Sequence, residues 1–149
     1  MIADDRVEHD IHIAAPPEVV FAYLIDPAKH ERWMGREVQA DPRPGGAYRC
    51  VVNDEATVIG EYLVVDPPRQ ISYTFGWEAN YGVPPGSSIV TITLTPEDGG
   101  TRLRLVHTGL PAEALDQHHL GWARYVPRLA TLAGGGDPGP DSWHEEMTA

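Results

Sequence analysis

The chain of 149 residues contains one cysteine, Cys50, and one lysine, Lys29. A single cysteine excludes an intrachain disulfide and a metal site made of several thiolates. Lys and Arg together number 11 against 22 Asp and Glu, which gives a formal net charge of -11. Because nucleic acids are bound through clustered basic side chains, we expect no nucleic-acid partner, and an anionic membrane surface is equally unsuitable.

Long apolar runs are missing as well, since no stretch approaches the roughly 20 residues that cross a bilayer. We therefore expect no membrane insertion. The N-terminal segment is charged from Asp4 onward and lacks the apolar core of a signal peptide. These features favour a cytoplasmic protein, and we expect it to be a monomer or a weak homodimer.

Recognisable catalytic and metal-binding motifs are also absent. His9 and His12 fall on opposite faces of an alternating strand, and no His-Glu-x-x-His spacing occurs. The glycines at 134–136 follow a helical segment and not a strand, which argues against a dinucleotide-binding loop. We predict no metal, no cofactor and no assigned catalytic residue.

The sequence does contain a pattern of short strands. Hydrophobic residues make up 42% and charged residues 22%, as in one ordinary globular domain, which we place at 1–133. Alternation predicts a strand at 7–13, and proline-led segments predict short helices at 18–25 and 28–33, the second capped by Asp26. Further strands are predicted at 37–41, 47–53, 56–65, 70–77, 88–95 and 101–108. The short turns between them indicate antiparallel neighbours.

The last part of the chain predicts one long helix followed by a tail. Pro111 opens the helical pattern and Gly134 follows its end. An apolar stripe at helical spacing comprises Leu115, His119, Trp122, Val126, Leu129 and Ala133. Residues 134–149 are rich in Gly and Pro and are expected to form a flexible tail.

The predicted sheet has one apolar face, which requires a cover. Alternation assigns to this face Tyr48, Cys50, Val52, Ile71, Tyr73, Phe75, Trp77, Val90, Ile92, Leu94, Leu103, Leu105 and His107. Six or seven strands at about 4.8 Å spacing are near 30 Å wide, whereas a helix with its side chains is about 10 Å across. A sheet of this width has to curl around the helix, and the mismatch predicts a cavity between the two.

His107 is the polar residue of most interest, because it shares the apolar face with Leu103 and Leu105. It fits either a structural histidine bonded to a backbone carbonyl or a ligand contact and general base, since its intrinsic pKa lies near neutrality. His118 and His119 point about 100° apart on a helix. We therefore expect one of them to face the cavity and the other to face solvent.

Several short motifs occur in an order and spacing that resemble one family. They are Ala15–Phe21, Trp33, Gly45–Tyr48, Gly60–Tyr62, Asp66–Pro68, Gly99–Thr101, His107–Gly109 and Gly121–Trp122. Together they resemble the START-like (SRPBCC) helix-grip superfamily, and within it the family homologous to the activator of the heat-shock protein 90 ATPase. The resemblance extends from about Val7 to Leu132.

The resemblance implies an α+β helix-grip fold, in which a curved antiparallel sheet of six to seven strands wraps around a long C-terminal helix, with two short N-terminal helices. It also implies a hydrophobic pocket, for which we assign the ligand-binding residues Trp33, Tyr48, Tyr73, Phe75, Trp77, Ile92, Leu105, His107, His118, Trp122 and Val126. The implied function is binding of a small hydrophobic or aromatic molecule by a non-catalytic carrier or sensor. A polyketide cyclase or aromatase-like enzyme and a chaperone-interacting module are the alternatives.

Overall fold

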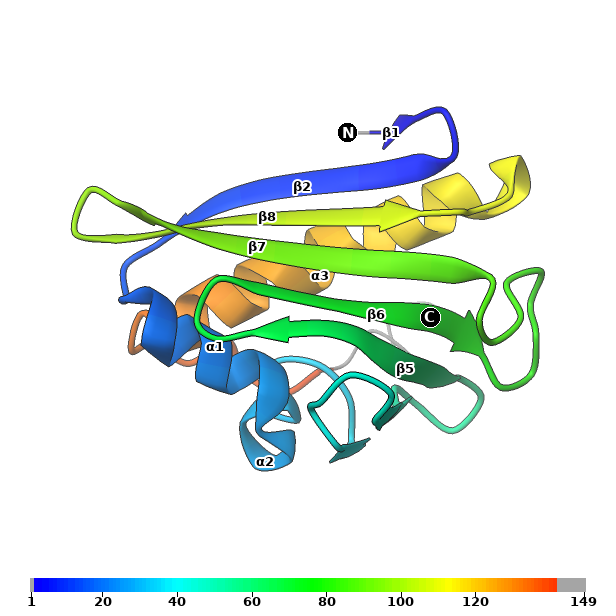
Figure 1. The fold of residues 1–149 in the computed structure, drawn as a ribbon, viewed down its shortest axis with the longest axis horizontal. Coiled ribbons are helices and arrows are strands. Elements are labelled where there is room, and N and C mark those ends of the chain that lie inside the picture. The colour runs from blue at the N-terminus through cyan, green and yellow to red at the C-terminus, as the bar shows by residue number, and fades with distance from the viewer. Residues whose placement is uncertain (1, 142–149) are drawn as a thin grey trace.

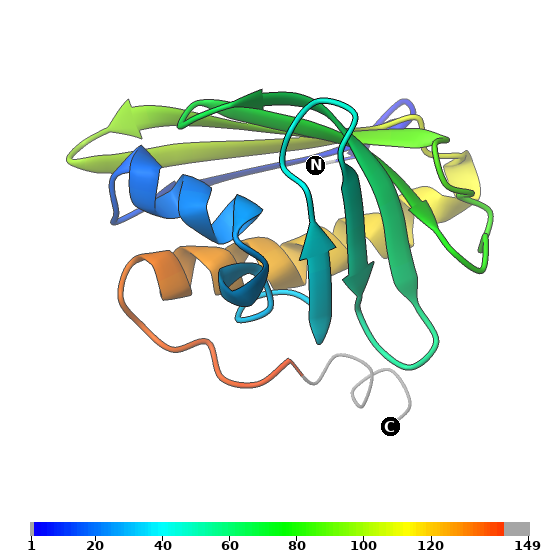
Figure 2. The same cartoon turned by 60° about the horizontal axis from the view of Figure 1, so that its bottom comes forward.

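The computed structural model describes residues 2–141, so the end of the predicted tail, including Trp143, lies outside the described residues. The elements are β1 (Ile2–Ala3), β2 (Arg6–Ile13), α1 (Pro17–Ile25), α2 (Pro27–His30), β3 (Glu37–Ala40), β4 (Ala47–Val51), β5 (Thr57–Asp66), β6 (Gln70–Trp77), β7 (Ser88–Glu97), β8 (Gly100–Thr108), the 3-10 turn η1 (Ala112–Ala114) and α3 (Leu115–Ala133). One sheet covers α3, and the short helices α1 and α2 lie on the same side of the sheet as α3 (Figures 1 and 2). This architecture confirms the predicted helix-grip fold.

The described strands form one antiparallel sheet in the order β1-β2-β8-β7-β6-β5-β4-β3. It has eight strands, so the prediction of six to seven was wrong. The strand that the prediction missed is β1, whose pairs with β2 are Ile2 with Val7 and Ala3 with Arg6. Two residues are too few for an alternating pattern to appear in the sequence.

The sheet curls toward α3, as the width argument predicted. The register of β5 against β6 shifts between Tyr62 and Val64, and an irregularity of this kind bends a strand and increases its twist. Figure 2 shows β3, β4 and β5 turning out of the plane of the remaining strands and descending beside the helix. The single sheet therefore encloses the core on two sides, because its β3–β5 part bends around the helix.

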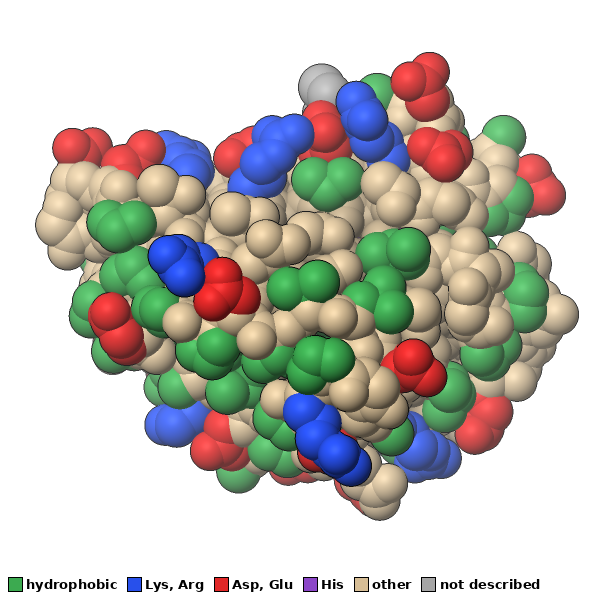
Figure 3. Space-filling view, viewed as in Figure 1, with side chains coloured by type: hydrophobic (Ala, Val, Ile, Leu, Met, Phe, Trp, Pro, Cys, Tyr) green, Lys and Arg blue, Asp and Glu red, His purple; other side chains and the backbone are tan. Residues whose placement is uncertain are grey.

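Alternation assigned the faces of the sheet correctly. On β8, Leu103, Leu105 and His107 are buried, whereas Arg102 and Arg104 are not. The outward arginines pair with acids on neighbouring strands, at Glu97 for Arg102 and at Glu8 and Asp10 for Arg104. Figure 3 shows acidic and basic side chains next to one another on this outer face.

The two short helices follow their predicted starts. Prolines occupy the first turn of both, and the Asp26 carboxylate accepts hydrogen bonds from the backbone N–H groups of Ala28 and Lys29. The α2 helix ends at His30 and not at 33 as predicted. Beyond it, Arg32 and Trp33 donate to carbonyls three residues back, so the chain tightens into turns.

Helix α3 covers the concave face of the sheet with its apolar stripe. Leu115, Trp122, Val126, Leu129 and Ala133 are buried, and Gly134 follows the last helical residue. Within residues 2–141, no helix is both long and apolar enough to cross a membrane.

The described part of the predicted tail lies against α3. The Arg128 guanidinium donates to the backbone carbonyls of Pro138, Gly139 and Pro140. Asp141 accepts a hydrogen bond from the Tyr125 hydroxyl at 2.7 Å. Residues 134–141 thus have defined contacts in this structure, while flexibility of the whole segment 134–149 stays a prediction.

We expect Trp122→Ala to lower the free energy of unfolding by about 3–5 kcal/mol, because Trp122 is buried at the centre of the helix–sheet contact and its removal leaves a cavity. Leu120→Ala is the matched control on the same helix, since Leu120 is 63% exposed. Urea unfolding of the two variants measures the difference. Equal midpoints for both would show that Trp122 does not hold α3 to the sheet.

Candidate functional site

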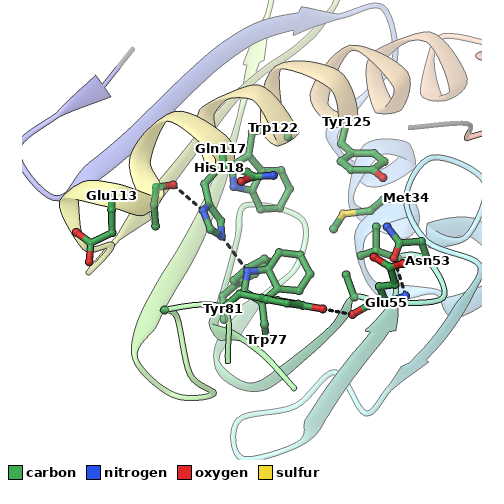
Figure 4. Close-up of a pocket in the computed structure, with 16 residues that line it drawn as sticks. Met34, Asn53, Glu55, Trp77, Tyr81, Glu113, Gln117, His118, Trp122 and Tyr125 are labelled. Atoms are coloured by element: carbon green, nitrogen blue, oxygen red, sulfur yellow. Dashed lines mark hydrogen bonds between the residues drawn. The ribbon is translucent and has the colours of Figure 1, made fainter. Parts of the chain in front are cut away.

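A cavity of about 550 Å³ lies between the first half of α3 and the end of β6, and it opens to solvent (Figure 4). Its walls come from the helix, from β6, from the turn joining β4 to β5 and from the loop that follows β6. The lining residues are Met34, Val52, Asn53, Glu55, Ala56, Phe75, Trp77, Tyr81, Gly82, Glu113, Ala114, Gln117, His118, Gly121, Trp122 and Tyr125.

The structure brings four of the predicted site residues together in this cavity, namely Phe75, Trp77, His118 and Trp122. The other seven lie in the core and do not line it: Trp33, Tyr48, Tyr73, Ile92, Leu105, His107 and Val126. The cavity lies toward the β4–β5 turn and the loop after β6, whereas α3 packs on β2. Whether any of these residues binds a ligand stays a prediction.

Both ring nitrogens of His107 form hydrogen bonds with side chains. The Trp122 indole Nε1–H donates to its Nδ1 at 3.0 Å, so the ring proton is on Nε2. That Nε2 lies 2.8 Å from the Ser88 hydroxyl, which donates to the Phe75 carbonyl. Burial, and to a lesser degree the nearby His118, lowers the pKa of His107 to about 3. The backbone-carbonyl partner considered from the sequence is therefore replaced by the side chains of Trp122 and Ser88.

In His118 the roles of the two ring nitrogens are reversed, so that Nδ1 is the donor and Nε2 is the acceptor. Its Nδ1 lies 2.8 Å from the Ala114 carbonyl and donates to it, and its Nε2 accepts from the Trp77 indole N–H at 3.0 Å. Burial lowers the pKa of this imidazole as well. Figure 4 shows the ring standing between the helix and Trp77, with both hydrogen bonds drawn. Neither nitrogen is left to accept a proton from a ligand.

The inner wall of the cavity is consequently aromatic without free polar ring atoms. Phe75 lies among the two pairs, with its ring centroid 4.6 Å from His107, 5.3 Å from Trp77 and 6.0 Å from Trp122. Both indole N–H groups are used by histidines. The wall thus presents ring faces and C–H edges to anything that enters.

Polar side chains lie at the mouth of the cavity. The exposed ones are Glu55, Glu113 and Gln117, and Asn53 is partly exposed. The Tyr81 hydroxyl donates to the backbone carbonyl of Glu55 and so ties the loop after β6 to the β4–β5 turn. Asn80 and Tyr81 both have left-handed backbone angles, with φ of 76° and 49°.

Three residues of the cavity, Glu55, Tyr81 and Tyr125, were not predicted from the sequence. Glu55 and Tyr81 lie in loops, where no periodic pattern assigns a side chain to a face. Tyr125 could have been found, since it follows Trp122 by three positions and therefore lies on the same side of the helix. It is 3% exposed and lines the cavity.

The expectation that one of the two adjacent helical histidines faces solvent was wrong. His119 is partly buried, and its ring stacks on His9 of β2 with centroids 4.9 Å apart. The two imidazoles lie between α3 and β2. Among residues 2–141, no group of three or more His, Cys, Asp or Glu side chains is placed to hold a metal ion.

Comparisons with known proteins agree with the fold. The family described as Activator of Hsp90 ATPase homolog 1-like protein matches residues 14–134. An AHSA1-like protein from Rhizobium etli, solved by NMR, is 46% identical with a TM-score of 0.73, and the match covers 91% of this chain and 86% of that protein.

Two further relatives are longer than this chain. DynU16, a protein of the dynemicin biosynthetic locus, is 27% identical with a TM-score of 0.78, and the match covers 91% of this chain and 49% of DynU16. An uncharacterized protein from Schizosaccharomyces pombe is 29% identical over 97 residues, which are 65% of this chain and 27% of the relative. The chain thus spans less than half the length of each of these two proteins.

The buried histidines predict an acid-sensitive fold. The folded-state pKa of His107, about 3, lies below the ordinary 6.5, and burial likewise lowers that of His30 to about 4. Between about pH 6.5 and 4 the unfolded chain therefore binds protons that the folded protein does not. The free energy of unfolding should fall as the pH is lowered through this window, by up to about 1.4 kcal/mol per pH unit for each such histidine.

The His107→Gln variant isolates this effect. A glutamine can accept from Trp122 and donate to Ser88 but does not titrate. Urea unfolding between pH 7 and 4 should give a slope against pH that is smaller by about one proton than that of the wild type. Identical slopes would mean that folding does not lower the pKa of His107, contrary to its burial and its hydrogen bonds.

Proposed function

Because this chain belongs to the family of activator of Hsp90 ATPase homolog 1-like proteins, we propose that its cavity binds a small apolar or aromatic molecule and holds it without chemical change. The observation that supports this function best is the aromatic inner wall, in which the indole and imidazole nitrogens are occupied by one another. Such a wall favours a ring or an alkyl group and offers no partner to a buried polar group.

The size of the cavity is suited to this role. A volume of about 550 Å³ lies within the range of roughly 300–1,000 Å³ in which small-molecule sites occur. The polar residues at the mouth, such as Asn53 and Gln117, would contact the one polar end of a ligand whose ring lies inside. A carrier or a sensor needs such a cavity with polar groups at its mouth and does not need a catalytic group.

A polyketide cyclase-like enzyme is the second candidate, supported by the likeness to DynU16 of the dynemicin biosynthetic locus. A cyclase of this kind would use a positioned acid or base within hydrogen-bonding reach of its substrate. His107 and His118 are the imidazoles nearest the aromatic wall, and both nitrogens of each are occupied. This observation favours binding over catalysis.

The chaperone-interacting module is the third candidate, and the description of the family supports it. The cytoplasmic location and the monomeric or weakly dimeric state stay predictions.

Dansylamide, a neutral aromatic fluorophore, should bind saturably and quench tryptophan emission, because Trp77 and Trp122 form the wall that its ring would contact. At a free concentration of 100 times its Kd, it should add about 2.7 kcal/mol to the free energy of unfolding. Fluorescence titration and thermal unfolding measure the two effects.

A blocked cavity provides the control for this experiment. Ala56→Phe places a ring in the cavity and should weaken dansylamide binding by about tenfold or more, or 1.4 kcal/mol. Ala123→Phe makes the same substitution at an exposed position of α3 outside the cavity and should leave binding unchanged. Equal loss in both variants, or no saturable binding to the wild type, would refute a ligand site in this cavity.

A further inference from the structure

The charges around the cavity are of one sign. Its sixteen lining residues include two carboxylates, Glu55 and Glu113, and no Lys or Arg. Within residues 2–141, neither carboxylate has a basic partner in an ion pair, so both are available to a ligand. Figure 4 shows them on different sides of the mouth, with Glu113 at the start of the helical segment and Glu55 beside Asn53.

The basic residues near the mouth are occupied by other acids. Arg36 pairs with Asp54, which precedes Glu55 in the same turn. Arg49 pairs with Glu78, just beyond Trp77, at 3.7 Å, and Arg124 pairs with Asp141 at 3.4 Å. A negatively charged ligand would therefore meet no free guanidinium on its way into the cavity.

The aromatic wall also favours a positively charged ligand. The faces of Trp, Tyr and Phe rings attract cations, and such rings line the cavity at Phe75, Trp77, Tyr81, Trp122 and Tyr125. An anion would require N–H donors instead. The two indole N–H groups that could have served it donate to His107 and His118, so the wall has neither a free indole donor nor a charged imidazole.

We propose that the cavity selects an aromatic molecule bearing an amine or quaternary ammonium group, with its ring against the wall formed by Trp77 and Trp122 and its cationic end at Glu55. This inference rests on the proposed function, since it names the class of ligand for the same cavity. Glu55 contributes more than Glu113, because Glu55 lies beside Asn53 and is bonded through its backbone to Tyr81, whereas Glu113 lies at the start of the helical segment and points away from the two indoles (Figure 4).

Three dansyl probes that differ in charge test the proposal. Dansyl-ethylenediamine carries an ammonium group, dansylamide is neutral, and dansylglycine carries a carboxylate. In fluorescence titrations at low salt, we expect the ammonium probe to bind about tenfold more tightly than the carboxylate probe, with the neutral one between them. Raising the salt concentration should reduce the ratio, because the carboxylates at the mouth are exposed.

Two isosteric variants locate the source of the preference. Glu55→Gln should reduce the tenfold ratio to about threefold or less, while dansylamide affinity is retained. Glu61→Gln makes the same change in net charge at an exposed position of β5 outside the cavity and should leave the ratio unchanged.

The outcomes separate this inference from the function on which it rests. Equal affinities for the three probes, or tightest binding of dansylglycine, would overturn the charge preference while leaving the binding site intact. An equal fall of the ratio in Glu55→Gln and Glu61→Gln would assign the preference to net charge and also overturn it. Failure of dansylamide itself to bind would refute the proposed function and the inference together.

Discussion

Two tryptophans and two histidines tie α3 to the sheet, and the pairs run in opposite directions. Trp122 of the helix donates to His107 of β8, and Trp77 of β6 donates to His118 of the helix. Each pair satisfies an indole N–H and an imidazole nitrogen that would otherwise cost about 1–3 kcal/mol to bury unpaired. With Phe75 between them, the pairs fix the helix at a set position over the end of the sheet, and the cavity begins where their rings end.

The same pairs determine what the cavity can do. An imidazole in a pocket is usually considered as an acid or a base, but here both nitrogens of each ring already have partners. The paired nitrogens are used within the protein, and the rings of Trp77, His118 and Trp122 line the cavity. The charged groups of the site lie at its mouth. Carboxylates are exposed there, and the nearby Arg36 and Arg49 form ion pairs with other acids. The site is thus divided into an apolar, uncharged interior and an acidic rim, which is the basis for both proposals.

Most of the fold could be predicted from the sequence, because period-two and helical patterns are local. The faces of β8, the cap at Asp26 and the burial of Trp122 all follow from such patterns. The Trp–His pairs could not be predicted, since His118 and Trp77 are 41 residues apart and nothing local marks them as partners. For the same reason the cavity was predicted only in general terms, between the helix and the sheet, and seven of the eleven residues assigned to it lie in the core. In the structure α3 packs on β2, and loop residues such as Tyr81 and Glu55 line the mouth of the cavity.

The tautomers of the two histidines test the central claim most directly. Long-range nitrogen–proton NMR spectra distinguish a ring proton on Nδ1 from one on Nε2. The hydrogen bonds require the proton on Nε2 in His107 and on Nδ1 in His118, so the two rings should show opposite tautomers at pH 7. If both rings have the same tautomer, or if either is charged at this pH, the pairs do not form and the wall of the cavity is not apolar.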